Sequence, residues 1–119
     1  MKATDLMIGD WVLCDGKPYQ VAEISAGLLR IDAERKLFAD PEDVEPIPLT
    51  AETLDKNGWK WGESWGAFVN DNSPIQFEHG TENNRFWWVE HNGLIAPINA
   101  VHELQHALRL CGIEKEVTL

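Results

Sequence analysis

The chain has 119 residues, of which 44% are hydrophobic and 25% charged, the composition of a folded protein rather than a disordered one. Its formal net charge is −10, and its basic residues are scattered along the sequence instead of clustered. This charge argues against direct contact with nucleic acid phosphates and against binding to an anionic membrane. The six tryptophans can pack in the hydrophobic core, and some of them can instead form an aromatic binding surface.

The two cysteines, Cys14 and Cys111, lie far apart and form no Cys-x-x-Cys pair. This usage is typical of a reducing compartment, while a single disulfide between the two stays an open alternative. The first residues lack the apolar core of a signal peptide, and no apolar run has the length of a membrane span. The sequence therefore predicts a cytoplasmic protein without a membrane partner.

Short strands separated by turns predict a small β-barrel over residues 1–48. Asp15-Gly16 between two apolar runs is a hairpin signal, because glycine accepts the positive φ that such a turn needs. Residues 19–24 alternate with the period of two that is typical of a half-buried strand, and two further short apolar runs follow. Three prolines within residues 41–48 then favour an extended connector, which predicts a domain boundary after residue 48.

Residues 49–119 predict a helix, an antiparallel β-meander and a second helix. Thr50 can cap the first helix, and Asn57-Gly58 can end it. Turn residues between the apolar runs are found at 71–74, 80–84 and 92–93. The expected fold class is therefore α+β, with an SH3-like barrel at 1–48 and a helix-flanked sheet module at 49–119.

The strongest strand and the last helix carry the features that concern function. Arg85 to His91 predicts a strand, in which Trp87 and Trp88 point to opposite faces, so that one enters the core and the other meets solvent or a partner. Residues 99–111 predict a helix that Gly112 closes.

The last predicted helix contains the sequence His102-Glu103-Leu104-Gln105-His106, which matches the His-Glu-x-x-His motif of zinc proteases. Histidines four residues apart lie one turn apart on the same face, so both imidazoles can reach one zinc ion. Glu103 would then act as the base that deprotonates a zinc-bound water. A small zinc-dependent hydrolase with ligands His102 and His106 is therefore one alternative.

Two observations argue against that alternative. On a helical wheel Val101, Leu104 and Leu108 form an apolar stripe, and His102 and His106 fall on the opposite side, as expected of a solvated helix face. Catalytic zinc also needs a third protein ligand, and the sequence after the helix offers none at a known spacing. The prediction is that the chain has no catalytic residue, no metal site and no cofactor.

The sequence Gly62-Glu63-Ser64-Trp65-Gly66 matches a Gly-x-Ser-x-Gly nucleophile elbow in residue spacing only. Such an elbow needs a strand before it and a helix after it, whereas strand or loop is predicted on both sides.

Trp59 and Trp61 are expected to share one face of a strand.

Several short blocks stand out, which are Pro46-Ile47-Pro48-Leu49-Thr50, then Glu52, Leu54 and Asn57-Gly58-Trp59, and Val101-His102-x-Leu104-Gln105. Together they resemble a family of small uncharacterised proteins that are encoded in bacterial genomes and their prophages. In that family the position of Glu103 is often glutamine and that of His106 often asparagine, which implies that the protease motif is accidental here. The Gly9-Asp10-Trp11-Val12 stretch separately resembles the start of SH3-like and KOW-like barrels. Neither resemblance carries an established activity.

These observations favour a non-enzymatic binding or accessory protein of bacterial or mobile-element origin, whose partner is a protein. The excess of tryptophan and the lack of a complete catalytic constellation support this prediction. The zinc hydrolase is the first alternative. An acidic decoy of DNA-binding proteins is the second, since a net charge of −10 can mimic a polyanion.

Overall fold

The computed structural model describes residues 1–32, 37–71, 73–79, 87–91 and 93–119. Contacts divide the chain into two compact units, Met1–Ile47 with Ala100–His102 (unit 1) and Pro48–Asn99 with Glu103–Leu119 (unit 2). Of the described residues, 45% lie in strands and 21% in helices. None of the helices in these ranges is long and apolar enough to cross a bilayer.

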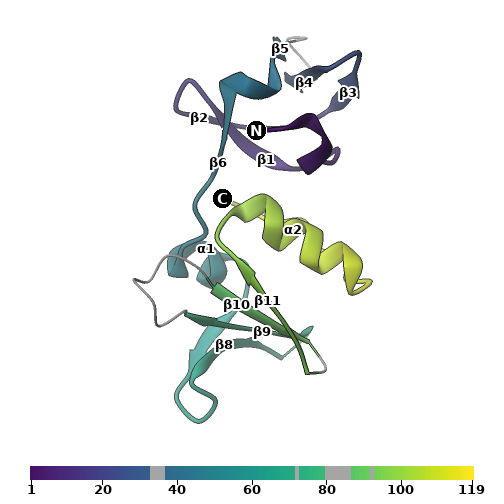
Figure 1. Cartoon of the computed structure of the whole chain (residues 1–119). Coiled ribbons are helices and arrows are strands. Elements are labelled where there is room, and N and C mark those ends of the chain that lie inside the picture. Colours follow the sequence, from purple (N-terminus) through teal and green to yellow (C-terminus); the bar gives the residue numbers. More distant parts are fainter. Residues whose placement is uncertain (33–36, 72, 80–86, 92) are drawn as a thin grey trace. The chain divides into compact units, whose positions relative to one another are not determined.

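Unit 1 consists of short strands and two short 3-10 helices (Figure 1). Its elements are η1 (Ala3–Asp5), β1 (Trp11–Cys14), β2 (Lys17–Gln20), β3 (Glu23–Ser25), β4 (Leu28–Asp32), β5 (Leu37–Ala39), η2 (Pro41–Asp43) and β6 (Val44–Pro46). They form two antiparallel three-stranded sheets, with the strand orders β2-β1-β6 and β3-β4-β5. The predicted hairpin turn is present, because Asp15 and Gly16 both have positive φ and Cys14 pairs with Lys17 across it.

The core of unit 1 joins its two sheets in one hydrophobic cluster. Val12 and Val44 come from the first sheet, and Leu29 and Ile31 from the second; all four are at most 2% exposed. Asp10, which is fully buried, holds the turn before β1, because its carboxylate accepts a hydrogen bond of 2.8 Å from the backbone N–H of Met7. Burial of alternate residues of these short strands thus stabilises the unit.

The predicted fold class is wrong. The structure is mostly β, and its three antiparallel sheets are open, so no closed barrel is present in the described part of the chain. A barrel needs an unbroken ring of paired strands. In unit 1 the strands are instead divided between two sheets, and the chain passes from β2 to β3 through Val21 and Ala22. The α+β assignment also fails because the two α-helices are short.

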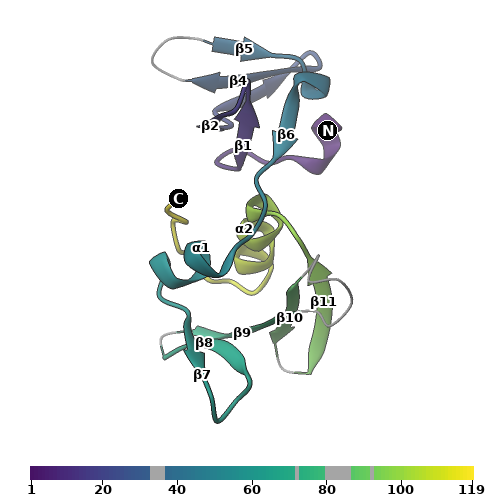
Figure 2. The same cartoon turned by 90° about the vertical axis from the view of Figure 1, so that its left-hand side faces the viewer.

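Unit 2 contains one five-stranded sheet and both α-helices. Its elements are α1 (Ala51–Lys56), β7 (Lys60–Gly62), β8 (Ala67–Asn70), β9 (Ser73–His79), β10 (Trp87–His91), β11 (Leu94–Ile98) and α2 (Val101–Leu110), the first two residues of which belong to unit 1. The strand order β11-β10-β9-β8-β7 is an antiparallel meander of five strands, whereas the sequence predicted three or four. Both helices lie on the same side of this sheet (Figure 2).

The ends of both helices follow the predicted capping. Thr50 Oγ1 accepts a hydrogen bond from the N–H of Thr53 at the start of α1. After α2 the N–H of Ile113 donates to the carbonyl of Leu108 at 2.8 Å, and Gly112, with φ of 72°, donates to Arg109. This is the bond pattern of a Schellman motif, in which glycine accepts the left-handed conformation.

The covered side of the five-stranded sheet is the core of unit 2. Trp59, Phe77 and Trp87 are at most 5% exposed, and the rings of Trp59 and Phe77 meet edge to face at 5.3 Å. The indole N–H groups of the two buried tryptophans donate to backbone carbonyls, Trp59 to Ile75 at 3.1 Å and Trp87 to Leu49 at 2.9 Å. These bonds remove the penalty for burying a polar N–H.

Asn57 has a second role besides ending α1. It is 3% exposed, and its side-chain amide forms bonds in both directions with the backbone of Thr118, at 2.7 Å and 2.8 Å. The amide thereby holds the C-terminal segment, in which Val117 is buried, against unit 2. The predicted turn at 80–84, the first two residues of the predicted strand at 85–91, and residues 36 and 92 lie outside the described residues.

Candidate binding surface

The protease-like motif lies in α2 as predicted, but one part of its environment differs from the prediction. The apolar stripe of Val101, Leu104 and Leu108 is buried, as the helical wheel predicts. His102 is also buried, with 8% of its surface exposed, and His106 is half-buried. The prediction that both histidines lie on a solvated face is therefore wrong for His102. The wheel separates the two sides of one helix but does not show which neighbouring segments cover the polar side.

The carboxylate of Glu103 is engaged at the start of the helix. Its Oε1 accepts a hydrogen bond of 3.1 Å from the backbone N–H of Asn99, just before α2 begins. An acidic side chain in the first turn is stabilised there by the unpaired N–H groups and the helix dipole. A base for zinc-bound water must instead direct its carboxylate to that water. The observed bond gives Glu103 a capping role.

A third metal ligand is missing in the part of the chain that the structure describes. Within these ranges no three side chains of His, Cys, Asp or Glu are grouped so that they could hold a metal ion. Catalytic zinc takes three protein ligands and a water. The zinc hydrolase with ligands His102 and His106 and the base Glu103 stays a prediction, and no third ligand for it is found among the described residues.

The other candidate nucleophiles do not form a reactive site. Residues 62–66 form the turn of the β7–β8 hairpin, closed by bonds from the N–H groups of Trp65 and Gly66 to the carbonyl of Gly62. No helix follows Ser64 directly, so the nucleophile elbow is absent from this turn.

Burial, together with the nearby carboxylates of Asp15 and Asp43, raises the pKa of the Cys14 thiol. This thiol is therefore protonated at neutral pH, the less reactive form.

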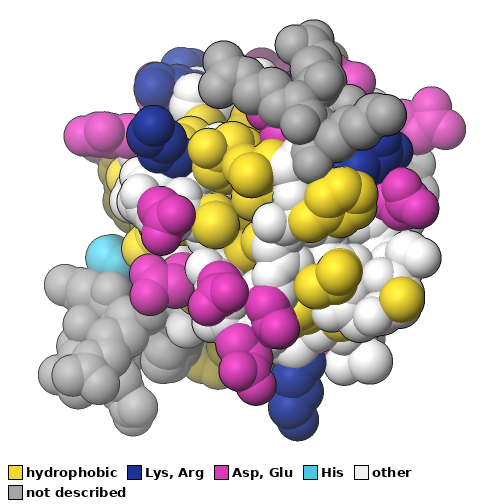
Figure 3. Space-filling model, turned by 90° about the horizontal axis from the view of Figure 1, so that it is seen from above, with side chains coloured by type: hydrophobic (Ala, Val, Ile, Leu, Met, Phe, Trp, Pro, Cys, Tyr) yellow, Lys and Arg dark blue, Asp and Glu magenta, His cyan; other side chains and the backbone are white. Residues whose placement is uncertain are grey.

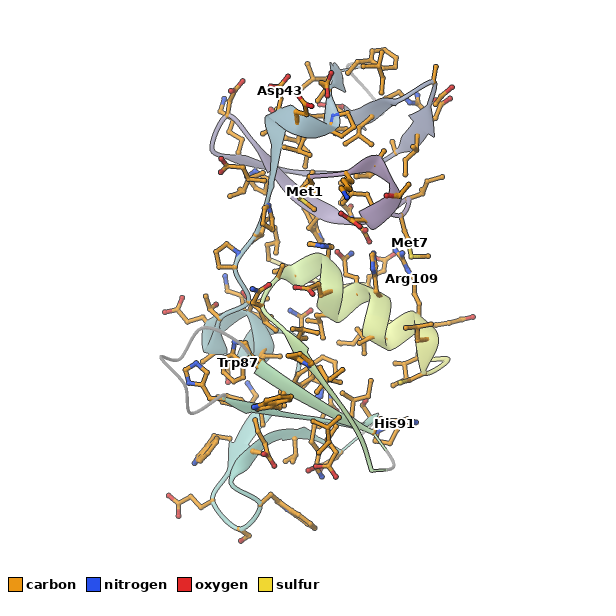
Figure 4. The ribbon with its side chains drawn as sticks, in the orientation of Figure 1. Met1, Met7, Asp43, Trp87, His91 and Arg109 are labelled. Atoms are coloured by element: carbon orange, nitrogen blue, oxygen red, sulfur yellow. The ribbon has the colours of Figure 1, made fainter. Side chains whose placement is uncertain are left out.

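Trp88 lies on the side of the five-stranded sheet that neither helix covers. It follows Trp87 in β10, and adjacent strand residues point to opposite sides. Trp87 is buried and Trp88 half-buried, as predicted for this pair. Figure 4 shows Trp87 at one end of β10 and His91 at the other. The side that neither helix covers thus presents the indole ring of Trp88 on β10, which lies next to the edge strand β11.

The neighbours of Trp88 on this side are two carboxylates and two apolar residues. Glu78 in β9 lies directly across from Trp88, and Pro97 in β11 lies across from it on the other flank. Glu90 is two residues further along β10 and lies across from Ile95, which is 63% exposed. Glu78, Trp88, Glu90 and Ile95 line a shallow depression of about 310 Å³. We call these four residues with Pro97 the Trp88 face.

A second tryptophan lies at the β7 side of the same sheet. The indole of Trp65 packs against Gly62. A side chain at position 62 would clash with it, because a Cβ atom there would lie 3.0 Å from the Cδ1 atom of Trp65. Gly62 pairs with Ala67, and Phe68, the next residue, points to the covered side, where its ring meets that of Trp87 at 5.5 Å. Trp65 is 67% exposed. The uncovered side of the sheet therefore carries two accessible tryptophans.

The charge of the Trp88 face is negative. The described ion pairs of Arg30 with Glu23 and of Lys60 with Asp55 do not include Glu78 or Glu90. Diagonal neighbours on a sheet are about 7–8 Å apart, which is the relation of Glu78 to Glu90 across the β9–β10 pair. The two carboxylates therefore place a concentrated negative potential beside an aromatic ring.

Unit 1 has a larger groove of about 450 Å³, lined among others by Ile8, Trp11, Pro18, Tyr19 and Asp32. Figure 3 shows unit 1 from the side of β4, β5 and η2, where apolar side chains are exposed beside acidic ones. Ile8 is 63% exposed and Phe38 58% exposed. Unit 1 thus also exposes apolar surface, but Asp32 is the one carboxylate among the described residues that line its groove.

Comparison of the chain with protein-family models, with curated proteins and with solved structures finds no match. The resemblance to small bacterial and prophage proteins and the resemblance to SH3-like and KOW-like domains in sequence stay predictions. The geometry of the surface is therefore the basis for a proposal on function.

The sequence singled out Trp87-Trp88 but missed the residues around Trp88. Glu78, Glu90, Ile95 and Pro97 come from three strands, and only their register brings them together. One signal was present, because the alternation in β9 and β10 places Glu78 and Glu90 on the side opposite to Phe77 and Val89. The pairing partner of each carboxylate is not encoded in that alternation.

Proposed function

We propose that this chain is a non-enzymatic protein-binding module and that the Trp88 face is its binding surface. The observation that carries the proposal is the half-buried Trp88 on the uncovered side of the sheet, with Glu78, Glu90 and Ile95 around it. The resemblance to bacterial and prophage proteins supports an accessory protein of bacterial or mobile-element origin.

The energetics of this face support association rather than stability. The half-buried indole of Trp88 and the exposed Ile95 leave apolar area in contact with water, and burial of such area stabilises a complex by roughly 25 cal/mol per Å². Tryptophan is among the residue types that most often dominate binding energy at interfaces. On the covered side Trp59, Phe77 and Trp87 are already buried, each at most 5% exposed.

The sheet edge next to this face favours side-chain recognition over strand addition. β11 is an edge strand of the five-stranded sheet, and Pro97 within it has no backbone N–H. A proline on an edge strand removes a donor that an added strand needs. A partner is therefore expected to bind across the face, through the side chains of Trp88 and its neighbours.

The test is a selection of binders from a random peptide library on the folded protein. Selected peptides should bind the native chain and lose at least about tenfold in affinity on Trp88→Ala, since a buried aromatic anchor contributes more than about 1.4 kcal/mol. The affinities are measured by calorimetry for each variant.

Trp61→Ala is the matched control. Trp61 is 55% exposed, but its ring packs on Phe68, which belongs to the covered side of the sheet. The control should bind the peptides as the native chain does, and circular dichroism should show both variants folded. Peptides that bind Trp88→Ala with unchanged affinity would contradict the proposal, as would a library that yields no binder to the native chain.

A further inference from the structure

We infer that the ligand of the Trp88 face is a cationic segment of another protein, with an arginine side chain seated over Trp88 between Glu78 and Glu90. This inference rests on the proposed function and names the chemistry of the partner.

The first step is the match between the ring and a guanidinium. The face of an indole is negative and attracts a cation within about 6 Å of its centre, and tryptophan is the strongest aromatic partner. A guanidinium is planar and weakly hydrated, so it stacks on a ring at a lower desolvation cost than an ammonium. Ile95 and Pro97 lie beside the ring and would contact the aliphatic part of an arginine side chain.

The second step is the position of the two carboxylates. Glu78 lies directly across from Trp88, and Glu90 lies two residues further along the same strand as Trp88. A guanidinium over the ring carries five N–H donors in a fixed fork, so it can donate to carboxylates on two sides. Neither carboxylate belongs to the two described ion pairs, which are Arg30 with Glu23 and Lys60 with Asp55.

The third step is the charge of the whole chain. A formal net charge of −10 attracts a basic partner over a distance set by the ionic strength, and it repels an acidic one. An aromatic ring on an open sheet could also stack on a neutral sugar, but such a ligand gains nothing from this net charge. The combination of charge and ring therefore favours a basic protein segment.

The experiment uses the full chain and three synthetic peptides of equal length. The first alternates arginine with serine, the second replaces each arginine by citrulline, and the third replaces it by glutamate. Citrulline keeps the shape of arginine and lacks its charge. Binding is followed by NMR through the indole N–H signals, which are assigned with single Trp→Phe variants.

The expected result is saturable binding of the arginine peptide that shifts the Trp88 signal. The variant E78Q with E90Q should weaken this binding by about tenfold, and the citrulline and glutamate peptides should not bind. Asp71→Asn with Glu63→Gln is the matched control for net charge, because it removes two exposed carboxylates outside the Trp88 face. This control should keep at least half of the affinity.

Three outcomes would overturn the inference. Equal binding of the citrulline peptide would show that shape and not charge is recognised, and equal weakening by the control pair would show a general polyanion effect of the kind expected for a DNA-mimicking decoy. Saturable binding of a neutral oligosaccharide such as cellohexaose at Trp88, without binding of the arginine peptide, would assign a glycan instead. The proposed function fails separately, in the library selection, if selected peptides do not need Trp88.

Discussion

The two sides of the five-stranded sheet show how adjacent residues of the same type acquire different roles. Trp87 is 5% exposed, donates its indole N–H to Leu49 and packs in T-shaped geometry against Phe68. Trp88, the next residue, lies on the other side between two carboxylates. The side chain of Trp87 is thus part of the core of unit 2, whereas that of Trp88 belongs to a surface.

The difference between the two tryptophans follows from the helices, because α1 and α2 pack on one side of the sheet only. Both sides of the sheet carry aromatic residues, and Trp59, Phe77 and Trp87 are buried on the side where α1 and α2 lie. Negative charge marks the other side, because Glu78 and Glu90 alternate with the buried residues of the same strands. A tryptophan on the polar side of an amphipathic sheet does not contribute to the core. It is typical of a binding surface.

The largest expected effect comes from the covered side. Trp87→Ala should lower the free energy of unfolding by about 3–5 kcal/mol, because it leaves a cavity and removes the donor to the Leu49 carbonyl. Trp88→Ala should lower it by less than about 1.5 kcal/mol, since that ring is half-buried. Urea unfolding of both variants measures the difference. Similar losses for the two variants would contradict the division of the sheet into a core side and a surface side.

The next effect concerns the segment that Asn57 holds. Asn57→Ala should lower the free energy of unfolding by about 2–3 kcal/mol, because it leaves the N–H and carbonyl of Thr118 without their partner. Hydrogen exchange at Thr118 should become faster in this variant. Asn57→Asp keeps the acceptor for the Thr118 N–H but directs a buried carboxylate oxygen at the carbonyls of Thr53 and Thr118, so it should be at least as destabilising as Asn57→Ala. An unchanged exchange rate at Thr118 in Asn57→Ala would show that other contacts hold this segment.

The smallest effect sharpens the description of the surface. Glu78→Gln with Glu90→Gln should leave the stability unchanged or raise it by up to about 0.5 kcal/mol, because it relieves repulsion between diagonal like charges. Thermal unfolding at about 20 mM and about 500 mM salt should show that any gain disappears when charges are screened. A loss of more than about 1 kcal/mol would mean that the two carboxylates stabilise the fold rather than a complex.

Local structure was predictable where one residue type has a single steric or capping role. The turn at Asp15-Gly16, the Thr50 cap and the Schellman bond after Leu108 are all present. Each depends on a few residues that are near in sequence, and so does the opposite exposure of Trp87 and Trp88. The prediction of a barrel was wrong, because closure depends on which strands pair at long range. Turn residues do not determine this pairing.

The candidate surface divides in the same way. The sequence by itself determined that two tryptophans alternate on one strand, that the chain is strongly acidic, and that a His-Glu-x-x-His pentapeptide lies in a helix. Only the tertiary structure decided that Glu78, Trp88 and Pro97 lie side by side, that Glu103 caps its own helix, and that His102 is buried. The physical reason is that strand register and burial are set by contacts between residues distant in sequence, whereas alternation and capping are set within a few residues.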